Sequence, residues 1–329
     1  MNRAATSSLA VVYEPITENL SQVQGEIFKL LSTSNDLIAQ VVKYFFSSTG
    51  KQLRPALCLL GANFGKPNWM EAIRIAASFE IFHSATLIHD DIIDGSILRR
   101  NLPTVPNKWG PQISVLVGDY LHNCAMHAVY STHNDRLVSL FIDTAAQVCD
   151  GEILEVKENH NFDLTEAQYF SIIEKKTAAL MAACVEAGGI AGKLSAEECS
   201  ALKKYGVYFG TAFQIVDDCL DFSGDTESFG KRPGADAESG VLTLPLIRLL
   251  NLVPANKKSE VFGAFKSYGT GDRVEYLVRL MKEYDTLNFA LEKAEEYTDK
   301  ARLELSTFKD SPSKDSLISL LDYVLKRSR

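Results

Sequence analysis

The sequence predicts an all-α protein, and three observations support this. Apolar residues recur at spacings of three and four, as at Leu137, Leu140 and Phe141. Strand-like alternation of apolar and polar residues is hard to find in any segment. No proline occurs between Pro111 and Pro233, an interval rich in Ala, Leu, Glu and Lys, which favours long uninterrupted helices.

The breaks between the expected helices are short and contain Gly, Pro, Asn or Ser. They fall at 65–67, 103–111, 159–163, 188–192, 229–240, 254–256 and 311–313. Thr165 and Ser195 are the expected N-caps of two helices. No break is long or polar enough to link two domains. We therefore expect one domain over residues 1–329, with residues 1–12 as a loose N-terminal extension.

Composition and charge disfavour some classes of function. The chain has 329 residues, of which 46% are hydrophobic, and its formal net charge is −8. It shows no basic stripe that would track a phosphate backbone, so we expect no nucleic-acid partner. No segment approaches the ~18 apolar residues that a membrane span needs.

The six cysteines and the N-terminus bear on the compartment. No two cysteines form a CxxC pair, and we expect all six to be reduced and structural, which implies a reducing compartment: Cys58, Cys124, Cys149, Cys184, Cys199 and Cys219. The apolar run near the N-terminus is too short for a signal peptide. We expect a cytoplasmic protein, or one of an organellar matrix if a transit peptide has been removed.

One short pattern, Asp-Asp-x-x-Asp within an apolar helix, occurs twice. The copies are Asp90, Asp91 and Asp94, and Asp217, Asp218 and Asp221. The first and last aspartates of each copy share one helix face, with Cβ atoms about 5–6 Å apart. One copy alone is compatible with a solvated surface, but carboxylates in apolar surroundings cost several kcal/mol per ion without a partner. Two such copies predict magnesium ions that hold a phosphorylated ligand.

Cationic side chains accompany these motifs. Arg99 and Arg100 follow the first motif closely, and further cations stand beside glycine-containing breaks or ahead of the second motif: Lys51, Arg54, Lys175, Lys176, Lys231 and Arg232. Guanidinium binds phosphate in a bidentate manner and ammonium acts as a point charge. Each of these residues alone is typical of a protein surface, whereas together they indicate a diphosphate-binding site.

With these motifs in this order, the chain resembles the trans-isoprenyl diphosphate synthases, also called polyprenyl synthetases. The matching segments are "GKQLRP", "FHSATLIHDDIID", "VLVGDYL", "CDGEILE", "EKKTAAL", "GTAFQIVDDCLDF" and "GKRPGAD…GVLTLP". The resemblance implies an isoprenoid synthase bundle of long helices around a central cavity, usually as a homodimer. It implies a prenyltransferase that condenses isopentenyl diphosphate head-to-tail with geranyl, farnesyl or geranylgeranyl diphosphate, giving a longer all-trans polyprenyl diphosphate.

The resemblance also assigns roles to single residues. Three magnesium ions would bind directly to Asp90, Asp94 and Asp217, supported by Asp91, Asp218 and Asp221. The allylic diphosphate would be held by Arg99, Lys176 and Lys231. Isopentenyl diphosphate would be held by Lys51, Arg54, His83 and Arg100. Thr177, Gln214 and the carbonyl of Lys176 would line the reaction centre and face the allylic cation.

Small residues precede the first motif by about one turn, namely Ala85 and Thr86. Aromatic residues there accompany short products in the family, so the resemblance implies octaprenyl to decaprenyl products first and geranylgeranyl next. The floor of the product site would involve Phe79, Phe82, Met126 or Tyr130, although ordinary core packing also explains the two phenylalanines. Release of such a product would bring the protein into peripheral contact with a membrane.

Five positions depart from the family pattern. Val241 stands where a lysine often precedes "LTLP", Gln52 replaces an arginine, Asn101 and Leu102 replace Gly-Lys, and Gly95 replaces an acidic residue. The change at Val241 bears on allylic affinity. One alternative is a weakly active or regulatory subunit of a heteromeric synthase. Another is a class I terpene cyclase, which shares the first motif but carries an Asn/Ser/Glu metal motif as its second.

Overall fold

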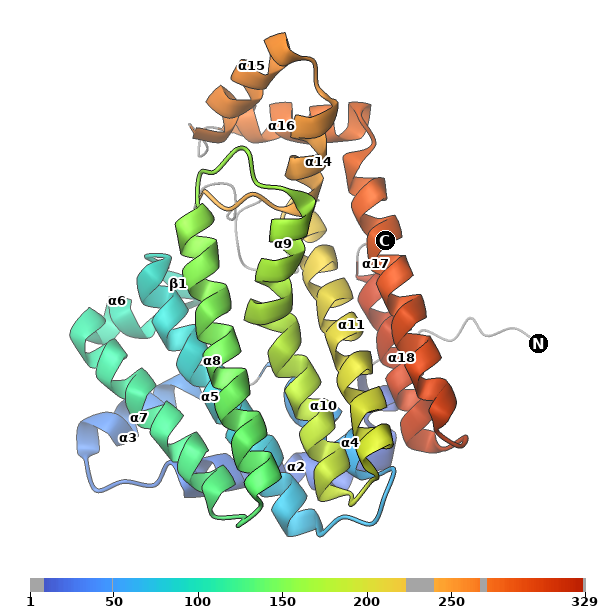
Figure 1. The fold of residues 1–329 in the computed structure, drawn as a ribbon. Helices are drawn as coiled ribbons and strands as arrows, with labels where there is room; N and C mark the ends of the chain where they lie inside the picture. Colours follow the sequence, from blue (N-terminus) through green and yellow to red (C-terminus); the bar gives the residue numbers. More distant parts are fainter. Residues whose placement is uncertain (1–8, 49, 223–239, 267–270, 328–329) are drawn as a thin grey trace. The chain divides into compact units, whose positions relative to one another are not determined.

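Nearly all regular elements among the described residues of the computed structural model are helices, which confirms the all-α fold. The structure describes residues 9–48, 50–222, 240–266 and 271–327. Figure 1 labels the helices, which are α1 (Leu9–Val12), α2 (Thr17–Leu30), α3 (Asp36–Phe45), α4 (Leu53–Ala62), α5 (Trp69–Ile93), α6 (Val105–Trp109), α7 (Pro111–Tyr130), α8 (Asp135–Glu158), α9 (Glu166–Ile173), α10 (Ala179–Ala191), α11 (Ala196–Leu220), α14 (Leu244–Leu252), α15 (Ala255–Lys266), α16 (Gly271–Glu283), α17 (Thr286–Glu304) and α18 (Pro312–Lys326). Shorter elements are the 3-10 turns η1 (Glu14–Ile16) and η3 (Leu305–Thr307), the π-helical segment η2 (Glu174–Ala178), and the antiparallel strands β1 (Leu98–Arg99) and β2 (Leu102–Pro103).

The chain divides into two compact units. The first comprises Met1–Thr144, Met181–Gly206 and Glu304–Leu320, and the second comprises Ala145–Leu180, Val207–Leu303 and Leu321–Arg329. Helices α8, α10, α11, α17 and α18 contribute residues to both units. The single domain expected from the sequence therefore stays a prediction. At the N-terminus, α1 is helical and buries Val12.

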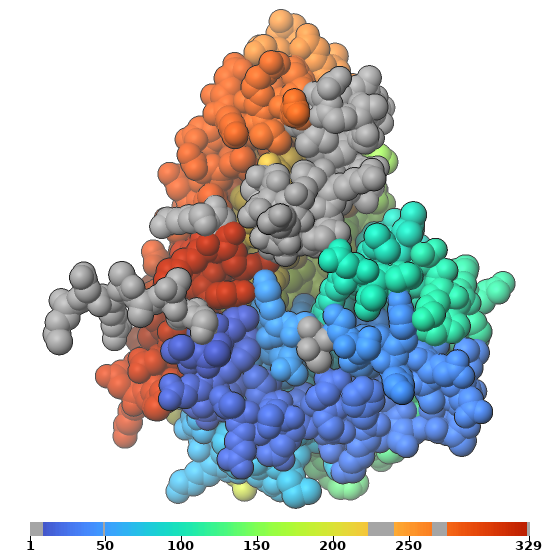
Figure 2. Space-filling model, turned by 180° about the vertical axis from the view of Figure 1, so that it is seen from behind, coloured from blue at the N-terminus to red at the C-terminus, as the bar shows by residue number. Residues whose placement is uncertain are grey.

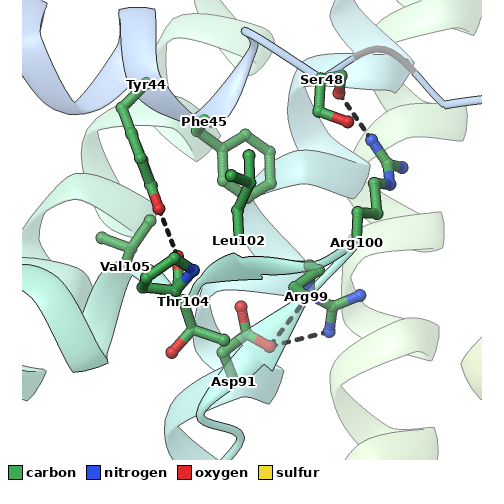
Figure 3. A pocket seen from close by; sticks show the side chains of 10 residues that line it. Tyr44, Phe45, Ser48, Asp91, Arg99, Arg100, Leu102, Thr104 and Val105 are labelled. Carbon is green, nitrogen blue, oxygen red and sulfur yellow. Dashed lines mark hydrogen bonds and ion pairs between the residues drawn. The ribbon is translucent and has the colours of Figure 1, made fainter. Parts of the chain in front are cut away.

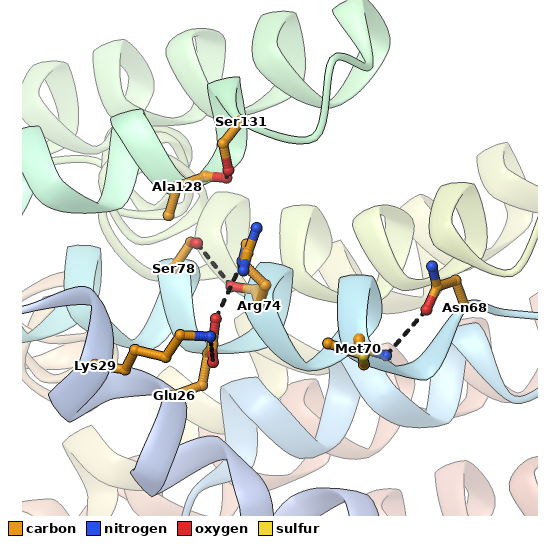
Figure 4. Close-up of polar contacts among 8 residues, drawn as sticks. All are labelled: Glu26, Lys29, Asn68, Met70, Arg74, Ser78, Ala128 and Ser131. Carbon is orange, nitrogen blue, oxygen red and sulfur yellow. Dashed lines mark hydrogen bonds and ion pairs between the residues drawn. The ribbon is translucent and has the colours of Figure 1, made fainter.

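Helix α5 lies at the centre of the first unit, where it packs against α2, α4 and α7. The side chain of Asn68 caps its start by accepting the N–H of Met70 at 3.2 Å (Figure 4). Arg74 Nε donates to Glu26 Oε1 of α2 at 3.0 Å, which ties the two helices together. Buried apolar residues occur on all sides of α5, as in a helix surrounded by protein; among them are Ile73, Ile75, Phe79, Ile81, Phe82 and Ile88.

The prediction of a break at 188–192 is wrong for residues 188–191, which are helical. Gly188 and Gly189 lie inside α10, which continues to Ala191. A Cβ atom on Gly188 would lie 2.0 Å from the carbonyl oxygen of Cys58, and one on Gly61 would lie 2.5 Å from that of Val185. These glycines therefore allow α4 and α10 to approach closely, whereas the sequence pattern suggested a turn.

Both helix starts expected from the sequence are confirmed. The Thr165 hydroxyl accepts the N–H of Gln168, and the Gln168 side chain in turn accepts the N–H of Thr165 at 3.0 Å. Ser195 and Glu198 form the same reciprocal pair, with donor–acceptor distances of 2.9 and 3.2 Å. Such capping boxes satisfy donors that the first turn of a helix leaves without partners.

In the first unit, α3 packs beside α6 and β2, and Figure 2 shows these parts of the chain in blue and teal. The rings of Tyr44 and Trp109 pack edge to face with centroids 5.0 Å apart, and the Tyr44 hydroxyl donates to the carbonyl of Pro103 at 2.7 Å. Within the described ranges, none of the helices combines the length and apolar character that a membrane crossing requires.

The six cysteines are free thiols. Four of them are buried, and burial raises the pKa of the Cys58 thiol to about 12. Cys149 is exposed, which corrects the expectation that all six are structural. The reducing compartment stays a prediction.

Candidate diphosphate and metal site

Both aspartate motifs lie at the C-terminal ends of long helices. Helices α5 and α11 are each 25 residues long, and the last aspartate of each motif follows the helix directly. The N–H of Asp94 donates to the carbonyl of Asp90 at 2.8 Å, and that of Asp221 donates to Asp217 at 3.2 Å. A helix C-terminus carries a partial negative charge, so carboxylates there are disfavoured by the helix dipole as well as by one another. Each motif therefore concentrates negative charge that a cation would relieve.

The second aspartate of each motif is buried. Asp91 is 1% exposed and Asp218 is 3% exposed. Asp91 Oδ1 accepts a hydrogen bond from Arg99 Nε at 2.9 Å, and Arg99 Nη2 lies 2.9 Å from the same oxygen in an ion pair (Figure 3). Asp218 accepts the Tyr169 hydroxyl at 2.6 Å and Gln214 Nε2 at 2.8 Å. These two aspartates are thus buried and oriented by internal contacts. Asp90, Asp94, Asp217 and Asp221 are half-buried or exposed, and Asp217 also accepts a hydrogen bond from Arg327.

The outer carboxylates fit a hard divalent cation. Each motif offers two carboxylates one helical turn apart, and oxygen donors of this kind are what Mg²⁺ and Ca²⁺ prefer. Among the described residues, no three His, Cys, Asp or Glu side chains converge as a complete metal-binding group. Mg²⁺ commonly binds through one or two carboxylates and takes its other ligands from water and from substrate phosphates.

The two arginines of the hairpin after α5 contact different partners. Arg99 lies on β1 opposite Leu102, whereas Arg100 and Asn101 form the turn with φ of 51° and 62°. Asparagine tolerates this left-handed conformation, which explains how it can replace the frequent glycine. Arg100 Nη1 donates to the carbonyl of Ser48 at 2.8 Å (Figure 3), and its guanidinium lies over Gly50.

A cationic pocket surrounds His83 in the first unit. His83, Glu80, Gly50, Gln52 and Arg100 are among the residues that line it. Burial, followed by the positive charges of Arg54, Arg99 and Arg100, lowers the pKa of His83 well below its ordinary value. Burial also raises the pKa of Glu80, although Arg54 and Arg100 oppose this. Three guanidinium groups therefore act on the imidazole of His83 and favour an anion near it, whereas the pocket itself is lined by one of them, Arg100, and by the carboxyl of Glu80.

Lys51, the fourth residue expected at this pocket, is exposed. Its carbonyl accepts the hydroxyl of Tyr13 at 2.8 Å, which holds the backbone ahead of α4. Gln52, the next residue, has a left-handed φ of 53°.

The low pKa of His83 predicts a pH-dependent stability. The folded protein keeps His83 neutral, whereas the unfolded chain protonates it below its ordinary pKa of 6.5, so acidification favours unfolding. On going from pH 7 to pH 5.5, the unfolding free energy of wild type should fall. In His83→Gln the same fall should be about 1 kcal/mol smaller. Urea unfolding at both pH values measures this, with the exposed His127→Gln as control. Equal losses in wild type and His83→Gln would contradict the assignment.

The residues expected at the reaction centre meet in the second unit. The Thr177 hydroxyl donates to Gln214 Oε1 at 2.9 Å, and Gln214 Nε2 donates to Asp218. With Tyr169 on the other oxygen of Asp218, four side chains form one hydrogen-bonded chain. Sequence reasoning missed Tyr169, because its partner is 49 residues away and no local motif marks it.

Lys176 lies in the π-helical segment η2, a geometry that is frequent at functional sites. Its ammonium contacts Glu155 and lies 2.8 Å from Glu152 Oε2. Burial lowers the pKa of Lys176, but Glu155 and Glu152 outweigh this and the net pKa is raised. Lys176 is therefore a charged residue whose charge is balanced within the protein, and its contact with an allylic diphosphate stays a prediction. Lys231 lies outside the described residues.

The residues expected to set product length belong to the first unit. Ala85 is buried, whereas Thr86 is half-buried and donates its hydroxyl to the carbonyl of His83 at 2.8 Å. Phe79 and Phe82 are buried, with ring centroids 5.5 and 5.3 Å from that of Phe141. This aromatic cluster accounts for both phenylalanines as core residues. Of the other two candidates for the floor, Met126 is half-buried and Tyr130 is exposed.

Comparisons with known proteins agree with this geometry. The polyprenyl synthetase family model matches residues 35–281. The chain is 31% identical to octaprenyl diphosphate synthase of Escherichia coli, over 98% of this chain and 100% of that protein. It is 33% identical to a short chain isoprenyl diphosphate synthase of Methanothermobacter thermautotrophicus, over 95% and 94%. The crystal structure of a polyprenyl synthase from Caulobacter crescentus, complexed with calcium and isoprenyl diphosphate, matches with a TM-score of 0.92 and 29% identity over 99% of both chains. The chain therefore belongs to the polyprenyl synthetase family, as its motifs indicated, and is a prenyltransferase.

Proposed function

We propose that this prenyltransferase uses magnesium to lengthen an allylic diphosphate by head-to-tail condensation with isopentenyl diphosphate. The observation that carries the proposal is the repeated design of the two motifs. Each places a buried, internally bonded aspartate between two accessible ones at a helix C-terminus. The Caulobacter crescentus relative in complex with calcium and isoprenyl diphosphate supports a divalent cation here. Three magnesium ions would be held by Asp90, Asp94 and Asp217, with Asp91, Asp218 and Asp221 in supporting roles.

The cationic residues serve two diphosphates. Lys51, Arg54, His83 and Arg100 hold isopentenyl diphosphate, supported by the positive pocket around His83. Arg99, Lys176 and Lys231 serve the allylic diphosphate. Magnesium, when bound, neutralises charge that builds on the departing diphosphate. Fixed cations do the same without reorganising during the reaction.

The hydrogen-bonded chain in the second unit explains how the protein would stabilise an allylic cation. Because Thr177 and Asp218 hold Gln214 from both ends, its amide cannot rotate freely. The Gln214 oxygen, the Thr177 oxygen and the Lys176 carbonyl offer fixed negative dipoles. The isopentenyl double bond attacks the allylic carbon, and a proton then leaves to the released diphosphate.

Stoichiometry tests this reaction directly. We expect one inorganic diphosphate released for each isopentenyl diphosphate consumed, and none when either substrate is omitted. Release from the allylic diphosphate alone would favour a terpene cyclase instead.

We propose a product of eight to ten isoprene units, since Ala85 and Thr86 leave space near the first motif. Thr86→Phe should shorten the product, because Thr86 is more accessible than Ala85 and shares the face of Asp90. Chromatographic sizing of the products measures this. Thr86→Val, nearly equal to threonine in volume, is the control and should keep the wild-type length. An unchanged product from Thr86→Phe would place the length determinant elsewhere.

We propose that the protein acts as a homodimer in the cytoplasm, with peripheral membrane contact during product release. Large exposed apolar residues in the first unit support a partner surface, notably Leu116 of α7 at 64% and Ile97 at 67%. Light scattering should give about twice the chain mass of 36.4 kDa. A monomer that becomes active only with a second chain would instead indicate a subunit of a heteromeric synthase.

A further inference from the structure

Asp217 is held by an arginine from the far end of the chain. Arg327 follows α18 directly, and its Nη2 donates to Asp217 Oδ1 at 2.7 Å. The Arg327 side chain is 9% exposed, and its guanidinium carbon lies 4.8 Å from the ring centroid of Phe213, one turn before Asp217. The burial of the arginine and its ring contact distinguish the pair from a fully exposed salt bridge, while the Asp217 side chain itself is 37% exposed.

The contact differs in kind from those that orient the neighbouring aspartate. Asp218 receives neutral donors, a phenol and an amide. Asp217 receives a guanidinium, which neutralises its charge and occupies an oxygen lone pair through a charge-assisted hydrogen bond. A divalent cation requires the same charge and the same oxygen donors. Arg327 and the cation therefore compete for Asp217.

We infer that Arg327 is a positioning residue, which holds Asp217 in the metal-free protein and sets the cation concentration at which this carboxylate becomes a ligand. The inference rests on the proposed role of Asp217 in metal binding. Because such coupling is reciprocal, cation binding in turn releases the end of α18.

Calorimetric titration of magnesium in the presence of inorganic diphosphate tests the inference. Arg327→Gln should bind magnesium about fivefold to tenfold more tightly than wild type, since one charge-assisted hydrogen bond no longer competes. In EDTA, the same variant should melt at a lower temperature than wild type. Lys326→Gln, which removes a positive charge from the adjacent exposed position, should match wild type in both measurements.

Arg327→Lys provides a second variant if Arg327→Gln does not fold. Lysine keeps the charge but loses the planar fork, so its magnesium affinity should lie between those of wild type and Arg327→Gln. Unchanged or weaker magnesium binding in the Arg327 variants, beside normal binding in wild type, overturns the inference alone. Failure of wild type itself to bind magnesium with diphosphate overturns the proposed function as well.

Discussion

Replacing Asp90 with asparagine should lower the rate of condensation about 10²- to 10³-fold while the protein stays folded. Asp90 is half-buried at the end of α5, and asparagine has nearly its shape but no negative charge. The loss therefore falls on cation binding and on the charge of the departing diphosphate. Steady-state kinetics at saturating substrates measure the rate, and the melting temperature in EDTA shows whether the protein stays folded.

The matched control is Asp91→Asn, one residue further along the same helix. Asp91 is buried against Arg99, so its change should lower the melting temperature in EDTA, which Asp90→Asn should not. The account would be contradicted if Asp90→Asn kept more than about a tenth of the wild-type rate, well above the loss expected for such a group.

Arg99→Met should cost about 3 kcal/mol of unfolding free energy, because it removes the guanidinium from a buried carboxylate. Arg99 Nε donates to Asp91 Oδ1 at 2.9 Å, Nη2 forms an ion pair with the same oxygen, and the Arg99 side chain is only 27% exposed. Urea unfolding at pH 7 measures the loss. The double variant Asp91→Asn/Arg99→Met should recover part of it, since the charge that needed the arginine is then absent.

Arg100→Met is the control for this prediction. Arg100 is exposed, and its hydrogen bond goes to the neutral carbonyl of Ser48, so the cost should stay below about 1 kcal/mol. Equal losses of unfolding free energy for the two arginine variants would show that the Arg99–Asp91 pair contributes no more to stability than the Arg100–Ser48 hydrogen bond.

Features that depend on local spacing were predictable from the sequence. The two Asp-Asp-x-x-Asp motifs, their helical setting and the capping residues Thr165 and Ser195 are all visible within four or five residues. The i, i+4 relation also places the first and last aspartates of each motif on one helix face, whereas the burial of the middle aspartate is known only from the structure.

Features that depend on tertiary contacts were not predictable. One partner of Asp218, Tyr169, lies 49 residues away, and Glu155, a partner of Lys176, lies 21 residues away, so spacing alone does not pair them. Gly188 was misassigned to a break because a glycine that ends a helix and a glycine that admits a neighbouring helix look alike in sequence. Local patterns identified the aspartate motifs, whereas tertiary packing determines which charges are balanced within the protein.

The central claim is magnesium-dependent chain elongation, and incorporation of labelled isopentenyl diphosphate onto farnesyl diphosphate tests it most directly. The account predicts no incorporation in EDTA, full recovery with magnesium, and products of eight to ten isoprene units on chromatographic sizing. Absence of incorporation with geranyl, farnesyl and geranylgeranyl primers alike, in the presence of magnesium, would contradict it.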